Sequence, residues 1–198
     1  MTQGFTQAFP VPLAVSLGGT GVTTSTGTGS TVLSNSPIFV TPTLGAATAT
    51  SLTFSPTTGG IVGTTTNDNT TAGSVGELIS SHVLAASAIS LTTATDANVT
   101  SISLTAGDWD VWGNVFIVLS NLGTVFRCWT SSTSATAPDN SLLSYAGLSP
   151  AALTNVGLNA PKLRYSLAAT TTIYISCSAT FASGTGSASG GIYARRRR

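Results

Sequence analysis

Charged side chains are scarce in this chain. They make up 7% of its 198 residues, whereas about a quarter is usual in a globular domain. The seven basic and six acidic residues give a net charge of +1, and four of the basic residues are Arg195–Arg198. Everything before that run is slightly acidic. We therefore expect no nucleic-acid partner, because such proteins carry a basic patch or stripe.

Segments typical of helices and of membrane spans are also missing. Glu, Lys, Gln and Arg are rare, and no window repeats apolar residues at three-to-four spacing. No uninterrupted apolar run approaches the roughly 20 residues of a membrane helix, and no basic segment precedes an apolar stretch near Met1. The sequence predicts an all-β protein without membrane insertion or a secretion signal.

Cysteine and histidine are too few for several kinds of chemistry. Cys128 and Cys177 cannot build a disulfide scaffold. Since free cysteine behaves as a small buried hydrophobe, we expect two unpaired core thiols, with a disulfide as the alternative. His82 is the only histidine, and it lacks companions for a metal site or a nucleophile triad. We expect it to be an ordinary strand residue, and we expect no cofactor or metal.

What the chain does contain divides it into unequal parts. Residues 1–55 are punctuated by Gly, Pro and Thr, so that no uninterrupted strand of normal length fits apart from short pieces. Apolar residues nevertheless recur every few positions, from Leu13 to Phe54. One copy would leave them in water, but several extended chains around one axis could bury them, so we expect oligomerisation. Residues 56–75 have almost nothing to bury and read as a linker.

Residues 76–198 show the two-residue period of β-strands. Apolar residues alternate with polar ones over 101–104, 109–119, 125–129, 163–167 and 172–181. AGDW, SNLG and APDN mark turns between these segments. In Val115–Leu119 both parities are apolar, which predicts a central strand covered on both faces. We expect an antiparallel, jelly-roll-like β-sandwich of about 120 residues.

Two motifs could suggest an enzyme, and neither has the required context. The glycine-rich stretch Gly18–Thr31 lacks the lysine of a phosphate-binding loop. Asp108 and Asp110 lie two residues apart on one strand face, whereas glycoside hydrolysis needs two carboxyl groups that flank the bond, about 5 to 10 Å apart. We favour a turn-and-edge role for this pair and expect no enzymatic activity.

Several aromatic residues could serve as contacts. Trp109 and Trp112 have opposite parity, so one of them should face outward or into a subunit contact. The candidate receptor or subunit contacts are Trp112, Tyr174 and Tyr193. Arg195–Arg198 could bind an acidic surface or the carboxylates of a neighbouring subunit, and the sequence leaves both open.

Phrases along the chain carry a family resemblance. The segment VSLGGTGVTTSTGTGSTVLSNSPIFVTPTLGAATATSLTF resembles the low-complexity part of many tailed-bacteriophage fibre and appendage proteins, and NDNTTAGSVGELISS and SLTAGDWDVWGNVFI resemble the start of the β-domain that often follows it. The resemblance implies a virion protein assembled in the bacterial host cytoplasm, commonly a homotrimer. Its N-terminal end would bind portal, collar, tail or capsid proteins, and its C-terminal end would point outward.

Two functions follow from this resemblance. In the first, the chain is a fibre or spike whose 76–198 domain forms the tip and binds a host surface glycan or protein. In the second, it is an architectural head or collar decoration without a receptor. The run FTQAFPVPL suits an extended peptide in a partner's groove, so the expected virion-attachment residues are Phe5, Phe9, Pro10, Val11, Pro12 and Leu13.

Overall fold

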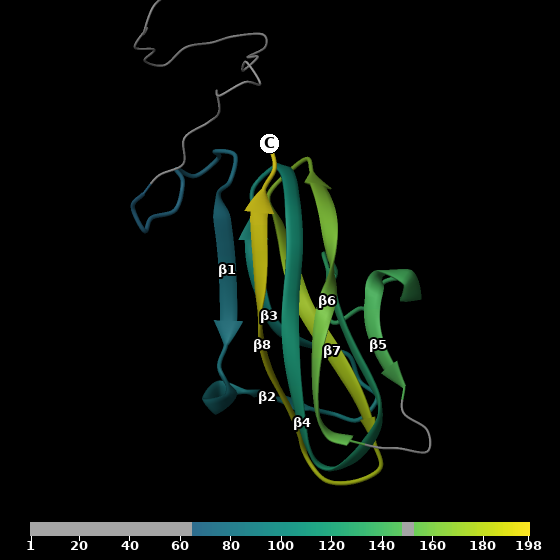
Figure 1. Cartoon of the computed structure of the whole chain (residues 1–198). Coiled ribbons are helices and arrows are strands. Elements are labelled where there is room, and N and C mark those ends of the chain that lie inside the picture. Colours follow the sequence, from purple (N-terminus) through teal and green to yellow (C-terminus); the bar gives the residue numbers. More distant parts are fainter. Residues whose placement is uncertain (1–64, 148–152) are drawn as a thin grey trace, which may run out of the picture. The chain divides into compact units, whose positions relative to one another are not determined.

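The described part of the chain is built almost entirely of β-strands (Figure 1). The computed structural model describes residues 65–147 and 153–198. The strands are β1 (Leu78–Val83), β2 (Ile89–Leu91), β3 (Ala97–Leu104), β4 (Gly107–Ser131), β5 (Leu143–Gly147), β6 (Leu153–Leu167), β7 (Thr171–Phe181) and β8 (Gly186–Arg196). Short 3-10 helices lie at η2 (Ala85–Ser87) and η3 (Asn140–Leu142). Every strand pairing is antiparallel, which confirms the predicted fold class.

The central strand is β4, which at 25 residues is several times longer than an average strand. Its first half pairs with β8 on one edge and β6 on the other. Its second half pairs with β7 on the edge that β8 occupies in the first half, and with β5 on the edge that β6 occupies. β4 therefore belongs to two sheets, and the change occurs between Leu119, opposite Gly186, and Gly123, opposite Phe181.

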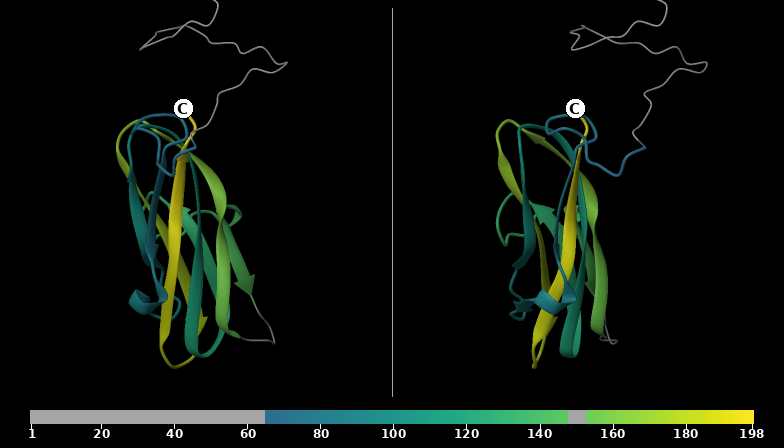
Figure 2. Two further views of the ribbon diagram at one scale, coloured as in Figure 1. Left: turned by 60° about the vertical axis from the view of Figure 1, so that its left-hand side comes forward. Right: turned by 90° about the vertical axis from the view of Figure 1, so that its left-hand side faces the viewer.

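Folding over at this corner creates two layers (Figure 2). One layer contains β1 and β2, then β8, the first half of β4 and β6, and the other contains β3, β7, the second half of β4 and β5. Side chains bridge the layers at both sides. Ser81 and Thr100 join β1 to β3 with an Oγ–Oγ1 distance of 2.7 Å, and the Ser144 hydroxyl donates to the Asn159 carbonyl between β5 and β6. The result is a nearly closed, jelly-roll-like sandwich, as predicted.

The core lies between the layers and follows the predicted parity. Trp109, Ile117 and Ile173 are fully buried. Other inward residues of the long strands are also fully or almost fully buried: Val111, Val115, Leu119, Phe126, Cys128, Ile175, Cys177, Ala179, Ile192 and Ala194. Removing this apolar area from water is the main favourable contribution to folding.

The corner itself corrects the expectation of a turn at SNLG. Residues 120–123 are the bend of one continuous strand, and no loop separates two strands there. At Gly123 a Cβ would lie 2.5 Å from Leu119 Cδ1 and 2.7 Å from Phe126 Cζ. A glycine is needed because the strand folds back so closely on its own side chains. At AGDW the chain bends at Ala106, and Gly107 to Trp109 already belong to β4, whereas APDN lies between β4 and β5 as expected.

Two expectations about solvent-facing parities were wrong. Phe116 and Val118 are 46% and 41% exposed, so Val115–Leu119 is covered on one face only. Conversely, Ser176 and Ser178 lie on the polar parity of β7 but are buried, because Asn98 binds Ser176 and Arg127 lies over Ser178. Side chains from neighbouring segments cover this outer face, which the alternation in β7 alone did not indicate.

Candidate functional site

The expected virion-attachment residues, Phe5 to Leu13, lie outside the described residues, as do all of 1–55 and part of the linker 56–75. Their roles stay predictions. The described residues contain no helix long and apolar enough to cross a membrane. They also contain no group of three or more His, Cys, Asp or Glu side chains arranged to hold a metal ion.

Two of the three predicted contact residues meet on the outer face of one layer. Trp112 in β4 and Tyr193 in β8 are cross-strand partners, and their rings stack with centroids 5.8 Å apart and planes 9° apart. His82, a β1 residue as expected, meets Tyr193 edge-on at 4.9 Å, and Lys162 lies over Trp112. Trp109 points into the core, so the prediction that one of the two tryptophans faces outward is confirmed. Tyr174 lies on the other layer, where it pairs with Ser101 and Ser131.

A hollow of about 650 Å³ adjoins Trp112. It is lined by Asn67, Asp68, Asn69, Thr70, Gly76, Leu78, Trp112 and Arg195. The Asn69 side chain bonds both the N–H and the carbonyl of Leu78, which fixes this segment against the start of β1. Trp112 and Tyr193 are only partly exposed. Their rings contact each other, His82 also contacts Tyr193, and Lys162 covers Trp112. These contacts stabilise the layer, and they leave little of either ring free to bind a partner.

The C-terminal arginines are structural, at least in part. Arg196 is buried and donates to Glu77 Oε2 at 2.9 Å, to the Ala106 carbonyl at 2.9 Å and to the Thr105 hydroxyl. Its guanidinium also lies 4.2 Å from the centroid of the Trp109 ring. The Gly73 N–H and Arg196 hold the pKa of Glu77 below its usual value. Arg196 thus ties the end of β8 to the segment before β1.

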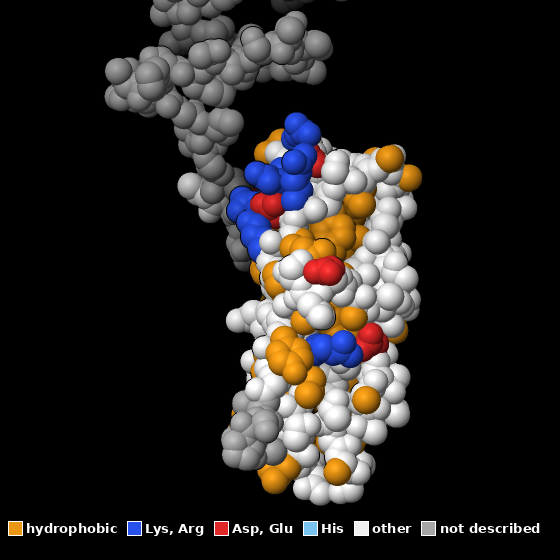
Figure 3. Space-filling view, turned by 90° about the vertical axis from the view of Figure 1, so that its right-hand side faces the viewer, with side chains coloured by type: hydrophobic (Ala, Val, Ile, Leu, Met, Phe, Trp, Pro, Cys, Tyr) orange, Lys and Arg blue, Asp and Glu red, His pale blue; other side chains and the backbone are white. Residues whose placement is uncertain are grey.

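Asp108 and Asp110 form ion pairs with four other basic side chains, those of Lys162, Arg164, Arg197 and Arg198. Arg164 binds both oxygens of Asp108, at 3.2 and 2.7 Å, and Arg198 contacts the same carboxylate. These bonds, with Arg164 first, lower the pKa of Asp108 to about 2. Asp110 pairs with Lys162 at 3.0 Å and Arg197 at 3.5 Å. Figure 3 shows most of the blue side chains of this face gathered at one end of the unit, with a second, smaller group of blue and red side chains farther down.

This cluster decides two open points. The aspartates are bound by cations of their own chain, and they lie in the central strand β4 with β6 on one side and β8 on the other, so the turn-and-edge role predicted for them was wrong. The partners of Arg196, Arg197 and Arg198 include carboxylates of this same chain, so a neighbouring subunit is not required to neutralise them.

The two cysteines are opposite each other in the ladder between β4 and β7. Both are buried and unpaired, as predicted. Burial raises the pKa of the Cys177 thiol to about 12 and raises that of Cys128 as well. Neither thiol is a nucleophile at neutral pH, because the thiolate is the reactive form.

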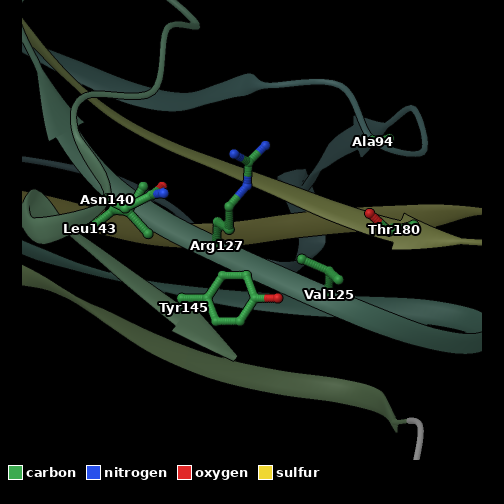
Figure 4. Close-up of a pocket in the computed structure, with 7 residues that line it drawn as sticks. All are labelled: Ala94, Val125, Arg127, Asn140, Leu143, Tyr145 and Thr180. Carbon is green, nitrogen blue, oxygen red and sulfur yellow. The ribbon is translucent and has the colours of Figure 1, made fainter. Parts of the chain in front are cut away.

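An open groove of about 580 Å³ lies on the outer face of the second layer (Figure 4). Its lining residues are Ala94, Val125, Arg127, Asn140, Leu143, Tyr145 and Thr180. Figure 4 shows Tyr145 extending toward Val125, with Asn140 and Leu143 at one end and Ala94 and Thr180 at the other. Tyr145 is 62% exposed. Tyr145 was not among the contact residues selected from the sequence, because nothing in β5 alone indicates that Arg127 lies opposite it.

Exposed apolar side chains gather near the corner of β4. Phe116, Val118, Leu122 and Leu153 are between 41% and 55% exposed. Cross-strand pairing places Phe116 opposite Gly157 and Val118 opposite Asn155, beside the start of β6 at Leu153. We call these four residues the corner patch. Clustered apolar side chains on an outer sheet face mark sites of protein contact more often than isolated ones do.

Comparisons with known proteins give distant neighbours. No family model matches the chain, and no curated protein does. Among solved structures it is similar to the infectious bursal disease virus Gx strain, with 13% identity, a TM-score of 0.40 and coverage of 70% of this chain and 38% of that one. It is also similar to the VP2 subviral particle of infectious bursal disease virus, at 12% identity, a TM-score of 0.40 and coverage of 61% and 32%. The structure of the Gt strain of the same virus shares 14% identity with a TM-score of 0.38, and the match covers 74% of this chain and 42% of that one.

The chain therefore spans less than half the length of these neighbours. The functional assignment has to come from this chain's own residues and surfaces.

Proposed function

We propose that this protein is a non-enzymatic structural component of a bacteriophage virion, a fibre or spike anchored by its N-terminal segment. Residues 76–198 are its displayed β-domain, and the assembled form is a homotrimer. The main support for the proposal is that one chain combines a fibre-like N-terminal sequence with a charge-poor, jelly-roll-like unit. Each part suits assembly: the first has recurrent apolar residues but no sequence pattern for a core of its own, and the second is held by packing and by ion pairs within the chain.

The corner patch supports the oligomeric part of the proposal. Phe116 and Val118 lie on the outer face of β4, flanked by Ser187 and Ser189 of β8 on one side and by β6 on the other. Small polar neighbours let a second surface approach closely, and a charge-free contact has no desolvation cost for ions. The same patch also favours the second candidate function, an architectural head or collar decoration that contacts only virion proteins.

Replacing Phe5, Phe9 and Leu13 together by serine should abolish incorporation into particles and leave the protein folded. These apolar residues are expected to dock in a groove on a partner, and removing three buried side chains costs several kcal/mol of binding. The measurement is the amount of variant protein on purified virions, produced in a host that supplies only the variant.

Serine replacements at Thr2, Thr6 and Gln7 provide the matched control, since they change the same segment without removing apolar area. Equal incorporation of the two triple variants would refute the proposed attachment.

A further inference from the structure

The exposed ring of Tyr145 forms a flat platform on the sheet. A Cβ at Gly147 would lie 2.6 Å from Tyr145 Cε1 and 2.7 Å from its hydroxyl, so the ring lies along β5 in space that only glycine leaves open. One face of the ring is thus supported by the strand, and the residue is 62% exposed. An aromatic ring that lies along a strand and keeps one face open is suited to stacking, because it presents a large apolar surface to a ligand.

Polar groups beside the platform are fixed in place. Arg127 is the cross-strand partner of Tyr145. Its Nε donates to Ser178 Oγ at 2.9 Å, and its Nη2 donates to Asp96 Oδ1 at 2.9 Å. Among the described residues, no partner occupies Nη1. The groove therefore presents Arg127 as a positioned donor, held by Asp96, which does not line the groove itself.

The two ends of the groove are also preformed. At one end, the Ala94 N–H donates to the Ala179 carbonyl at 2.8 Å, and Ala94 has a φ of +54°. At the other end, Asn140 begins η3, whose first turn is capped by Asp139 through the Ser141 N–H at 2.9 Å. A groove with fixed walls, an aromatic floor and few polar groups has the character of a small-ligand site.

The charge in the groove restricts the ligand class. Asp96 already neutralises Arg127, so an anionic ligand would compete with a bound carboxylate and gain little. A purely apolar ligand would leave the hydrogen-bonding positions of Arg127, Asn140 and Thr180 unmatched. A neutral sugar ring satisfies both demands, because one face carries C–H groups that stack on an aromatic ring and its edge carries hydroxyls that donate and accept.

We infer that the Tyr145 groove binds a neutral pyranose unit of a saccharide. The sugar stacks on Tyr145, and its hydroxyls bind the Arg127 guanidinium and the side chains of Asn140 and Thr180 at the two ends. This inference deepens the proposed display function, since it supplies the chemistry of a host glycan contact.

Binding is tested with the full-length protein on an array of short neutral oligosaccharides, with oligosaccharides that contain uronic or sialic acid alongside. We expect retention on at least one neutral saccharide. Tyr145→Ala should weaken this binding by about tenfold or more, and Tyr145→Phe should preserve it. Gly147→Val should weaken it comparably by displacing the ring.

Leu84→Ala is the control, because Leu84 is an exposed apolar residue, 72% accessible, that does not line the groove. It should bind as the unmodified protein does. Thermal melting should be unchanged by Tyr145→Ala, since the side chain is mostly exposed. Binding that survives Tyr145→Ala, binding confined to acidic saccharides, or no retention of any neutral saccharide would overturn the inference.

These outcomes are independent of virion assembly. A protein absent from particles would refute the proposed function and leave Tyr145-dependent sugar binding standing. A protein present on particles but without sugar binding would refute only the groove.

Discussion

Ile117→Asp should prevent the β-unit from folding. Ile117 is fully buried in the first half of β4, which is the strand shared by both layers. A carboxylate at this position would be surrounded by apolar side chains and would have no cation to pair with, at a cost of several kcal/mol. The loss is comparable to the whole stability of a small domain. The measurement is soluble yield of the full chain, followed by circular dichroism on heating.

Asn114→Asp is the matched control, because it places the same side chain three positions away on the same strand, on the exposed face and outside the corner patch. It should fold with nearly normal melting. Equal behaviour of the two variants would contradict the assignment of the inner and outer faces of β4.

Arg196→Met should destabilise the β-unit by about 3 to 5 kcal/mol, the usual cost of removing one partner from a buried ion pair. The Glu77 carboxylate would remain buried, with only the Gly73 N–H among the described groups to bind it. The Thr105 and Ala106 oxygens would also lose their donor. Chemical denaturation of the full chain measures the change in the free energy of unfolding.

The double variant Arg196→Met with Glu77→Gln should recover part of that loss, because it leaves no unpaired buried charge. Arg198→Met is the control, since Arg198 is largely exposed and should cost little. Additive effects of the Glu77 and Arg196 changes would contradict direct coupling between them.

Much of the fold could be predicted from local periodicity. The alternation in 109–119 and 172–181 correctly identified the inward side chains of β4 and β7, because a two-residue period is a property of the strand itself. β8 was not predicted, since GSASGGIYARR contains little to indicate a strand. Its Gly190 needs a positive φ of 153°, and a Cβ there would lie 2.1 Å from the Asn114 carbonyl oxygen. Such close backbone approach is invisible until the partner strand is known.

The candidate site could be predicted only in part. Trp112 and Tyr193 were selected from the sequence as outward aromatics, and they do lie on one outer face. That their rings stack on each other became clear only from the pairing of β4 with β8. The Tyr145 groove combines residues from the segment before β3, from β4, β5 and β7. Its parts are separated by up to 86 positions between Ala94 and Thr180, and no local pattern links them. Register between strands is a long-range property that composition does not encode.

The central claim, that this chain is an outward-pointing virion component, is tested most directly by imaging purified phage particles with bound antibody fragments raised against the β-domain. The account predicts antibody density on the outer surface of intact particles, at fixed positions and in groups of three copies. Particles that lack the label, while free protein in the same lysate binds the antibody, would contradict it.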